Sequence, residues 1–99
     1  MAFAFLQDVP ITWQVYTHIR ALLGEKPSPG LIVHVVMETD QGLRYLDVWE
    51  SREAHHAFVE ETLHPAVARG LSRAGVARPP EPETRPVTVL EVWAGPATL

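Results

Sequence analysis

The stretch LIVHVVMETDQGLRYLDVWES, residues 31–51, decides the fold. It holds two runs rich in β-branched and aromatic residues, 31–39 and 43–50, joined by a short polar connection that contains Gly42. Such a pattern predicts a β-hairpin, because glycine can take the positive φ that a tight turn needs. Ser51 follows at once and can cap a helix, so the hairpin is expected to lead directly into a helical segment.

The chain before the hairpin supplies a further strand and a helix. Residues 2–8 are apolar and aromatic, which is typical of a short strand buried on both faces. Thr12 can cap a helix that runs to about Leu23. The segment 24–30, with its prolines and glycines, cannot continue that helix and predicts a loop.

The chain after the hairpin supplies a second helix and a last strand. The helix begins after Ser51, and Pro65 predicts a kink or break just before it, with a short continuation to about Leu71. Residues 76–86 are rich in proline and predict an extended surface loop. The β-branched run VTVLEVW, residues 87–93, predicts the last strand.

The predicted order βαββαβ matches the split βαβ motif, so residues 1–99 are expected to form one ferredoxin-like α+β domain with a four-stranded antiparallel sheet. Right-handed crossovers would place both helices on one face of the sheet and leave the other face bare. The first strand of the hairpin carries apolar residues on both parities, such as Val35 and Val36. Since neither face suits water, the sequence predicts a homodimer that pairs through the bare face as a dimeric α/β barrel.

Composition and charge exclude several classes of function. The chain has 8 basic and 12 acidic residues, and the basic ones are scattered singly, so no nucleic-acid partner is predicted. There is no cysteine, and His56 and His64 are eight residues apart rather than four, so no metal site is predicted. The apolar start MAFAFLQDV contains Asp8 and lacks a basic n-region, so we expect a cytoplasmic protein without a membrane partner.

Three short segments resemble a known family. They are GLIVHVV at 30–36, the Thr-Asp-x-Gly turn at 39–42, and DVWES at 47–51. With the order of elements, they resemble the dimeric α/β-barrel superfamily, and within it the small proteins near the antibiotic-biosynthesis monooxygenases. The resemblance implies a ligand cavity between sheet and helices, and chemistry on an aromatic or polyketide-like molecule without a cofactor.

No catalytic motif is complete, so the candidate site consists of single residues whose chemistry suits proton transfer. A carboxylate beside an imidazole fixes its tautomer and makes it a plausible general base, and the hairpin carries one of each. A further histidine is expected to point inward from the second helix. The predicted catalytic residues are His34, Asp47 and His55, and the predicted substrate-binding residues of the apolar cavity are Tyr16, Tyr45, Trp49 and Phe58.

Whether His34 meets Asp47 depends on the register of the hairpin. A three-residue loop over 40–42 puts Asp47 on the opposite face from His34. A two-residue loop over 41–42 sets His34 opposite Trp49, one diagonal from Asp47, and makes a dyad possible. The position of the glycine favours the longer loop.

Each candidate also has a structural interpretation. His34 could be a buried histidine satisfied by a neighbour, Asp47 a buried acceptor, Trp49 a core anchor and His55 a polar plug at the core edge. Three functions remain as hypotheses. The first is a cofactor-independent enzyme of the antibiotic-biosynthesis-monooxygenase type, and the second is a non-catalytic dimeric ligand-binding or assembly module. The third is haem binding, for which His55 would supply the axial ligand.

Overall fold

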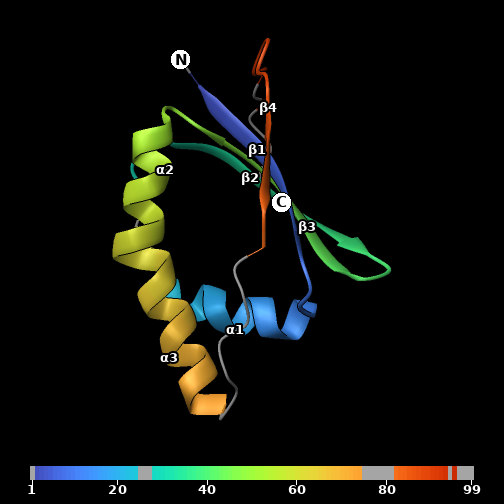
Figure 1. Cartoon of the computed structure of the whole chain (residues 1–99), viewed down its shortest axis with the longest axis vertical. Coiled ribbons are helices and arrows are strands. Elements are labelled where there is room, and N and C mark those ends of the chain that lie inside the picture. The colour runs from blue at the N-terminus through green and yellow to red at the C-terminus, as the bar shows by residue number, and fades with distance from the viewer. Residues whose placement is uncertain (1, 25–27, 75–81, 94, 96–99) are drawn as a thin grey trace.

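The computed structural model describes residues 2–24, 28–74, 82–93 and 95 of the 99-residue chain. Its strands are β1 (Phe3–Val9), β2 (Leu31–Thr39), β3 (Gly42–Trp49) and β4 (Thr84–Val87). Its helices are α1 (Trp13–Leu23), α2 (Arg52–Phe58), the π-helical turn η1 (Val59–Leu63) and α3 (His64–Ala74) (Figure 1). The predicted α+β order of elements is confirmed over these residues.

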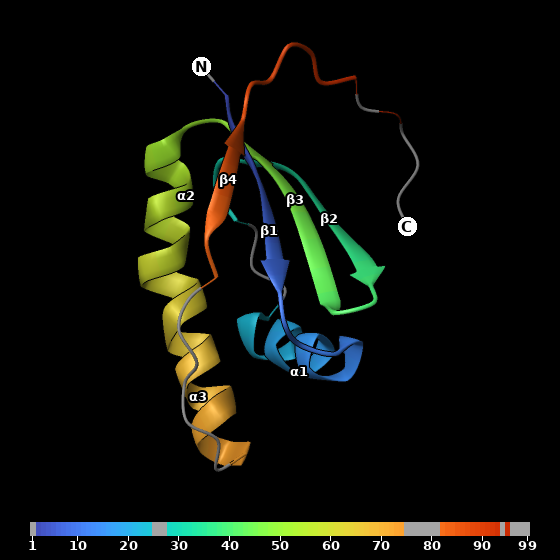
Figure 2. The ribbon, with the colours of Figure 1, turned by 45° about the vertical axis from the view of Figure 1, so that its right-hand side comes forward.

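The strands form one antiparallel sheet in the order β2-β3-β1-β4, and α2 and α3 make a long helical rod beside it (Figure 2). Aromatic contacts join the helices to the sheet: Tyr16 of α1 packs on Tyr45, and His55 of α2 packs on Phe5. Phe5 lies opposite Asp47, two residues from Tyr45, so Phe5 and Tyr45 point to the same side of the sheet. The helices therefore cover one face, as predicted.

Both helical segments begin where the sequence places a cap. The Thr12 hydroxyl accepts the backbone N–H of Val15 at 3.2 Å, and the Ser51 hydroxyl accepts that of Ala54 at 3.0 Å. Each bond satisfies one of the backbone donors that a helix leaves unpaired at its start. The two predicted helix starts are confirmed.

The predicted kink or break before Pro65 takes the form of a π-helical turn, η1, and the helical rod is not interrupted there. Proline lacks an N–H, and its ring would clash with the carbonyl four residues earlier in a regular α-helix. The π-turn η1 immediately precedes this point, and the His64 N–H donates to the Val59 carbonyl, five residues back. The wider turn accommodates the proline, and α3 continues to Ala74 rather than to about Leu71.

No helix in the described part of the chain is long and apolar enough to cross a membrane.

The hairpin has neither of the two predicted registers. Thr39 pairs with Gly42, so the loop is residues 40–41 and the glycine belongs to β3. A Cβ atom at Gly42 would lie 2.5 Å from the carbonyl oxygen of Val9, and the residue has a φ of 139°. Two features therefore require glycine here: the positive φ, as predicted, and the close approach of the β1 end, a tertiary cause that the local sequence does not reveal.

The last strand lies earlier in the sequence than predicted. The strand expected over 87–93 is wrong: β4 is Thr84–Val87, and the following residues leave the sheet. Val87 pairs with Ala4, and β1 begins at Phe3, so the chain beyond Val87 has almost no neighbouring strand left to pair with.

The predicted surface loop over 76–86 is wrong at its C-terminal end, because 84–86 are part of β4. Pro86 is tolerated there since β4 is an edge strand, which needs ladder bonds on one side only. The Gln7 side-chain amide donates to the carbonyl of Pro82 at 2.9 Å and ties the approach of β4 to β1. Residues 76–81 lie outside the described residues.

The sheet face opposite the helices is open and apolar, as predicted. Val35 lies opposite Leu46, one residue from Asp47, and so points away from the helices. Val33, Val35 and Met37 alternate along β2 and are 36%, 37% and 37% exposed. We call the surface around these three residues the bare face.

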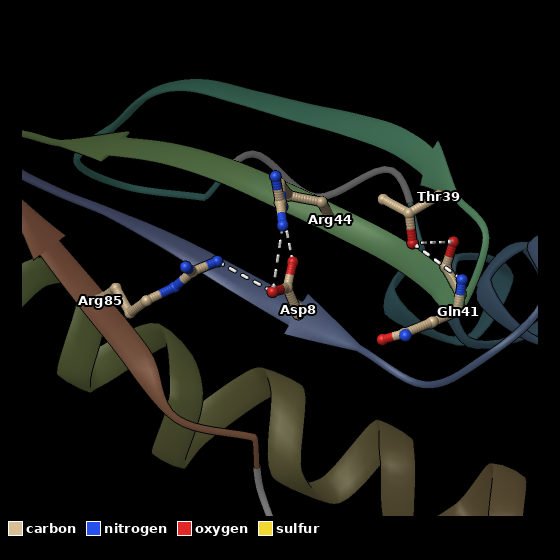
Figure 3. A network of polar contacts seen from close by, with 6 residues as sticks. Asp8, Thr39, Gln41, Arg44 and Arg85 are labelled. Carbon is tan, nitrogen blue, oxygen red and sulfur yellow. Dashed lines mark hydrogen bonds and ion pairs between the residues drawn. The ribbon is translucent and has the colours of Figure 1, made fainter.

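A charged cluster lies at the edge of the bare face, where Asp8 of β1 joins Arg44 of β3 and Arg85 of β4 (Figure 3). The Arg44 guanidinium donates to both carboxylate oxygens of Asp8, at 2.6 and 3.3 Å, and Arg85 donates to one of them at 2.9 Å. The hydrogen bond from Arg44 is the main reason that the pKa of Asp8 is lowered.

This cluster predicts a pH dependence of stability. Because the pKa of Asp8 is lower in the folded protein than in the unfolded chain, ionised Asp8 stabilises the fold. This stabilisation is present above the pKa of the unfolded chain, about 3.9, and is lost as the pH falls through the pKa of the folded protein. We expect Asp8→Asn to narrow the difference in unfolding midpoint between pH 6 and pH 2, measured in urea. Asp40→Asn, at an exposed position of the hairpin loop, is the control and should leave that difference as in the wild type.

Candidate functional site

Two residues predicted to be catalytic lie opposite each other in the sheet: His34 on β2 and Asp47 on β3. Nδ1 of His34 is 2.5 Å from Oδ1 of Asp47. This direct pairing follows from the loop at residues 40–41, which neither predicted register contained. An imidazole–carboxylate dyad therefore lies on the helix-covered side of the sheet.

The dyad is extended at both ends by aromatic side chains. The Tyr16 hydroxyl of α1 is 3.1 Å from Nε2 of His34, and the Trp49 indole N–H donates to Oδ2 of Asp47 at 3.1 Å. We call Tyr16, His34, Asp47 and Trp49 the polar chain. It runs from the first helix, across two strands, to the aromatic core beneath α2.

The donor pattern of the polar chain assigns its protons. An indole N–H can only donate, so Oδ2 of Asp47 is an acceptor. Oδ1 of the same carboxylate also accepts, so the proton of the neutral His34 imidazole lies on Nδ1 and is donated to Oδ1 in a hydrogen bond. Nε2 is then an acceptor for the Tyr16 hydroxyl. His34 is thereby held in the tautomer that a general base at Nε2 requires.

Burial makes these bonds necessary. The Asp47 side chain is 10% exposed and the His34 side chain 28% exposed. A carboxylate removed from water is strongly destabilising unless donors replace the water, and here each oxygen has one protein donor. His34 is the more accessible member of the dyad, so its imidazole and not the carboxylate is placed to meet a small molecule.

Two tyrosines surround the imidazole. The ring of Tyr45 meets that of His34 edge-on, with centroids 5.2 Å apart, and also contacts Tyr16. Burial raises the pKa of the Tyr16 hydroxyl and that of the Tyr45 hydroxyl. Both phenols therefore stay protonated around neutral pH and can serve as hydrogen-bond donors rather than as bases.

Trp13 belongs to this group but was not among the predicted site residues. Its ring stacks on Tyr16 with centroids 5.2 Å apart and is 52% exposed. The signal in the sequence is the spacing of three between Trp13 and Tyr16, which puts both rings on one side of a helix. An exposed aromatic ring at the rim of a polar site is a plausible contact for a flat ligand.

The other predicted site residues form a separate aromatic cluster. His55 packs against the rings of Phe3, Phe5 and Trp49 at centroid distances of 5.6, 4.6 and 5.3 Å. Phe58 packs on the same Trp49, which is 1% exposed. Trp49 therefore fills the core rather than lining an open cavity. His55 points inward, as predicted, and it contacts Trp49, which in turn donates to Asp47, the partner of His34.

Two surface hollows lie away from the polar chain. One is on the outer side of the helical rod, around Arg52, His56 and Glu60. The other is beside the hairpin loop, around Asp8, Asp40 and Arg44. The apolar cavity predicted from Tyr16, Trp49, His55 and Phe58 corresponds to neither. Within the described ranges, no group of three or more His, Cys, Asp or Glu side chains could hold a metal ion.

Comparison with known proteins links this chain to others through structure alone. No family model matches the sequence, and no curated protein matches it. A protein of Chloroflexus aurantiacus J-10-fl assigned to the antibiotic biosynthesis monooxygenases superposes with a TM-score of 0.59 at 18% identity, over 95% of this chain and 98% of that one. Rv0793 from Mycobacterium tuberculosis superposes with a TM-score of 0.56 at 16% identity, over 95% of this chain and 100% of that one.

A third structure superposes less closely. SnoaB, a cofactor-independent oxygenase from Streptomyces nogalater, covers 97% of this chain and 96% of its own, at 17% identity and a TM-score of 0.46. The first two superpositions cover nearly the whole of each chain and confirm, at the level of fold, the resemblance carried by segments 30–36, 39–42 and 47–51. This chain has the ferredoxin-like α+β fold of antibiotic-biosynthesis-monooxygenase-like proteins.

Proposed function

We propose that this chain is a cofactor-independent enzyme that removes a proton from an acidic aromatic or polyketide-like small molecule. The general base is His34, and Asp47 fixes its orientation. The observation that carries the proposal is the dyad itself, in which Nδ1 of His34 lies 2.5 Å from a buried carboxylate. Such a pair leaves Nε2 as the basic atom and stabilises the imidazolium that forms when a proton is taken up.

The acidic proton of the substrate would take the place of the Tyr16 hydroxyl at Nε2. None of the residues of α1, which carries Tyr16, is buried, and a shift of that side chain would exchange its ring contacts with Trp13, His34 and Tyr45 for contacts with the substrate. Trp13 and Tyr45, which both contact the Tyr16 ring, then offer aromatic surfaces beside the vacated position. The substrate contacts that we propose are Tyr16, Tyr45 and the rim residue Trp13.

The step that follows proton removal needs only molecular oxygen. A substrate CH₂ group made acidic by a neighbouring aryl ketone gives a carbanion, which transfers its electrons to O₂. Loss of the second hydrogen then leaves a carbonyl group, with one oxygen atom retained in the product and the other released as water. The substrate is the reductant in this balance, and the protein supplies the base, the orientation and a water-poor surface.

The test is oxygen uptake by the purified protein with a panel of naphthols and cyclic aryl ketones that carry an acidic CH₂ group. We expect turnover of at least one compound without added metal, flavin or haem, and a product that has gained one oxygen atom. Saturable binding across the panel with no oxygen uptake and no proton exchange into solvent deuterium would contradict the enzyme proposal.

A second candidate function is a non-catalytic ligand-binding or assembly module, and one observation favours it. The Tyr16 hydroxyl already satisfies Nε2 of His34, so the polar chain is complete as a structural network. Haem binding through His55 has less support, because Phe3, Phe5 and Trp49 already pack around that imidazole. A hemin titration in which the Soret band keeps the position and shape of that of free hemin would agree with this arrangement.

For the assembly we propose a homodimer through the bare face. Apolar side chains that alternate along an edge strand and stay more than one-third exposed are costly to leave in water, and a second copy is the simplest cover.

We expect Val35→Asp, in the middle of this face, to raise the dimer dissociation constant by at least about 100-fold, because it places a charge in an apolar contact. Val15→Asp adds the same charge at a position on α1 that is 40% exposed, and it should leave the dissociation constant unchanged. Sedimentation velocity over a concentration series measures both.

A further inference from the structure

The Tyr16 hydroxyl occupies the one ring nitrogen of His34 that a ligand could use. Nδ1 of His34 is bonded to Asp47, and Nε2 lies 3.1 Å from the Tyr16 hydroxyl, whose proton it accepts. A neutral imidazole has a single acceptor nitrogen, so the base is not available while this bond is made. The chain itself therefore fills the place that the proposed function gives to the substrate.

The ring of Tyr16 is the middle one of three nearly parallel rings. Its plane makes an angle of 18° with that of Trp13 and of 20° with that of His34, at centroid distances of 5.2 and 6.2 Å. Tyr45 meets the same ring edge-on at 5.8 Å. Tyr16 thus has the contacts that a planar aromatic ligand with a hydroxyl group would have: a flat contact from Trp13 and an acceptor on His34.

Helix α1 is anchored at its C-terminal half, away from Tyr16. A Cβ atom at Gly70 of α3 would lie 3.2 Å from the Leu22 side chain and 3.9 Å from that of Ile19, so the two helices approach closely there. Tyr16 lies in the other half of α1, where its ring contacts the sheet, and none of the residues of α1 is buried. The Tyr16 side chain can therefore leave His34 while the helix stays attached to α3.

We infer that Tyr16 is a gate on His34: its hydroxyl competes within the chain for Nε2, and a ligand of the site binds by displacing it. This inference rests on the proposed function, because it takes Nε2 of His34 as the atom that meets the ligand. It adds to that proposal a closed state, in which Tyr16 occupies the base, and an open state, in which Tyr16 has moved away. The stability of the closed state then lowers the affinity of the site for every ligand.

The gate predicts how ligands respond when the hydroxyl is removed. Tyr16→Phe keeps the ring but abolishes the bond to Nε2, so the closed state becomes less stable. A neutral hydrogen bond changes an equilibrium constant by about 2- to 10-fold. Because the closed state contains no ligand, 2-naphthol, which can donate to Nε2, and 2-methoxynaphthalene, which cannot, should both bind more tightly by the same factor. If the hydroxyl contacted the ligand directly, its removal would weaken binding instead.

Diethyl pyrocarbonate tests the gate without a ligand, because it acylates an unprotonated ring nitrogen of histidine. In the full-length chain at pH 7, peptide mass spectrometry gives the rate at His34 relative to that at His56, which lies on the exposed side of α2. We expect Tyr16→Phe to raise this relative rate about 2- to 10-fold. Thr17→Val is the matched control: it also removes a hydroxyl from α1, one that donates to the Gln14 carbonyl, and it should leave the rate unchanged.

Titration calorimetry with the two naphthalenes, under argon, gives the second measurement. An unchanged acylation rate at His34 in Tyr16→Phe, or weaker binding of either naphthalene to that variant, overturns the inference. If neither naphthalene binds, the acylation rate alone decides. Neither measurement involves oxygen, so a chain that opens as expected but takes up no oxygen contradicts the enzyme proposal and not the gate.

Discussion

Replacing His34 by alanine is expected to lower kcat/KM by about 10²- to 10⁴-fold, the usual contribution of a positioned general base. Asp47→Asn should cause a loss of similar size for a different reason. An asparagine can still accept the Trp49 indole N–H through its oxygen, but it then presents an NH₂ group to Nδ1 of His34. The imidazole must accept there, so its proton moves to Nε2, and the base is lost while the shape of the site is kept.

His56→Ala is the control for the first of these variants. His56 lies on the exposed side of α2 and belongs neither to the polar chain nor to the aromatic cluster around Trp49, so its loss should leave kcat/KM within about twofold. Thermal midpoints show whether each variant still folds, and the ¹⁵N shifts of the His34 ring report the tautomer directly. Full activity in both His34→Ala and Asp47→Asn would remove the dyad from the mechanism and favour the non-catalytic module.

The elements that could be predicted from sequence are those determined by local chemistry. The hydroxyls of Thr12 and Ser51 cap their helices because the residue type and the next three backbone amides are sufficient for the bond. The strand pattern of 31–39 likewise needs only its β-branched residues.

The features that could not be predicted depend on distant partners. Gly42 is needed because of the carbonyl of Val9, which lies far from it in sequence. The register has its loop at residues 40–41, and this register decides that His34 meets Asp47. The last strand was misplaced for a similar reason: residues 87–93 have strand propensity, but the strand they would extend ends at Phe3.

The residues of the site were therefore predicted from the sequence, but which of them lie together in the fold was not. Histidine and carboxylate on one hairpin were enough to propose a dyad, whereas the split into a polar chain and an aromatic core depends on which side chains share a face. Trp49 shows the difference most clearly. It was expected either to line a cavity or to anchor the core, and it is a buried residue that donates a hydrogen bond to Asp47, the carboxylate partner of His34.

Trp49→Phe is accordingly expected to reduce the free energy of unfolding by about 2–4 kcal/mol, more than the lost ring atoms alone account for. The substitution keeps an aromatic ring against His55 and Phe58 but removes the only indole donor to Oδ2 of Asp47, and a buried acceptor left without a partner costs about 1–3 kcal/mol. Urea denaturation at pH 7 measures the loss.

Phe58→Leu is the matched control, because it disturbs the packing on Trp49 and leaves the N–H in place. A double-mutant cycle with Asp47→Leu isolates the bond, since Trp49→Phe should lose only its packing part where there is no carboxylate to satisfy. If the cost of Trp49→Phe is the same with and without Asp47, the indole is only a core ring. If it falls, the tryptophan also holds the carboxylate, and through it the tautomer of His34.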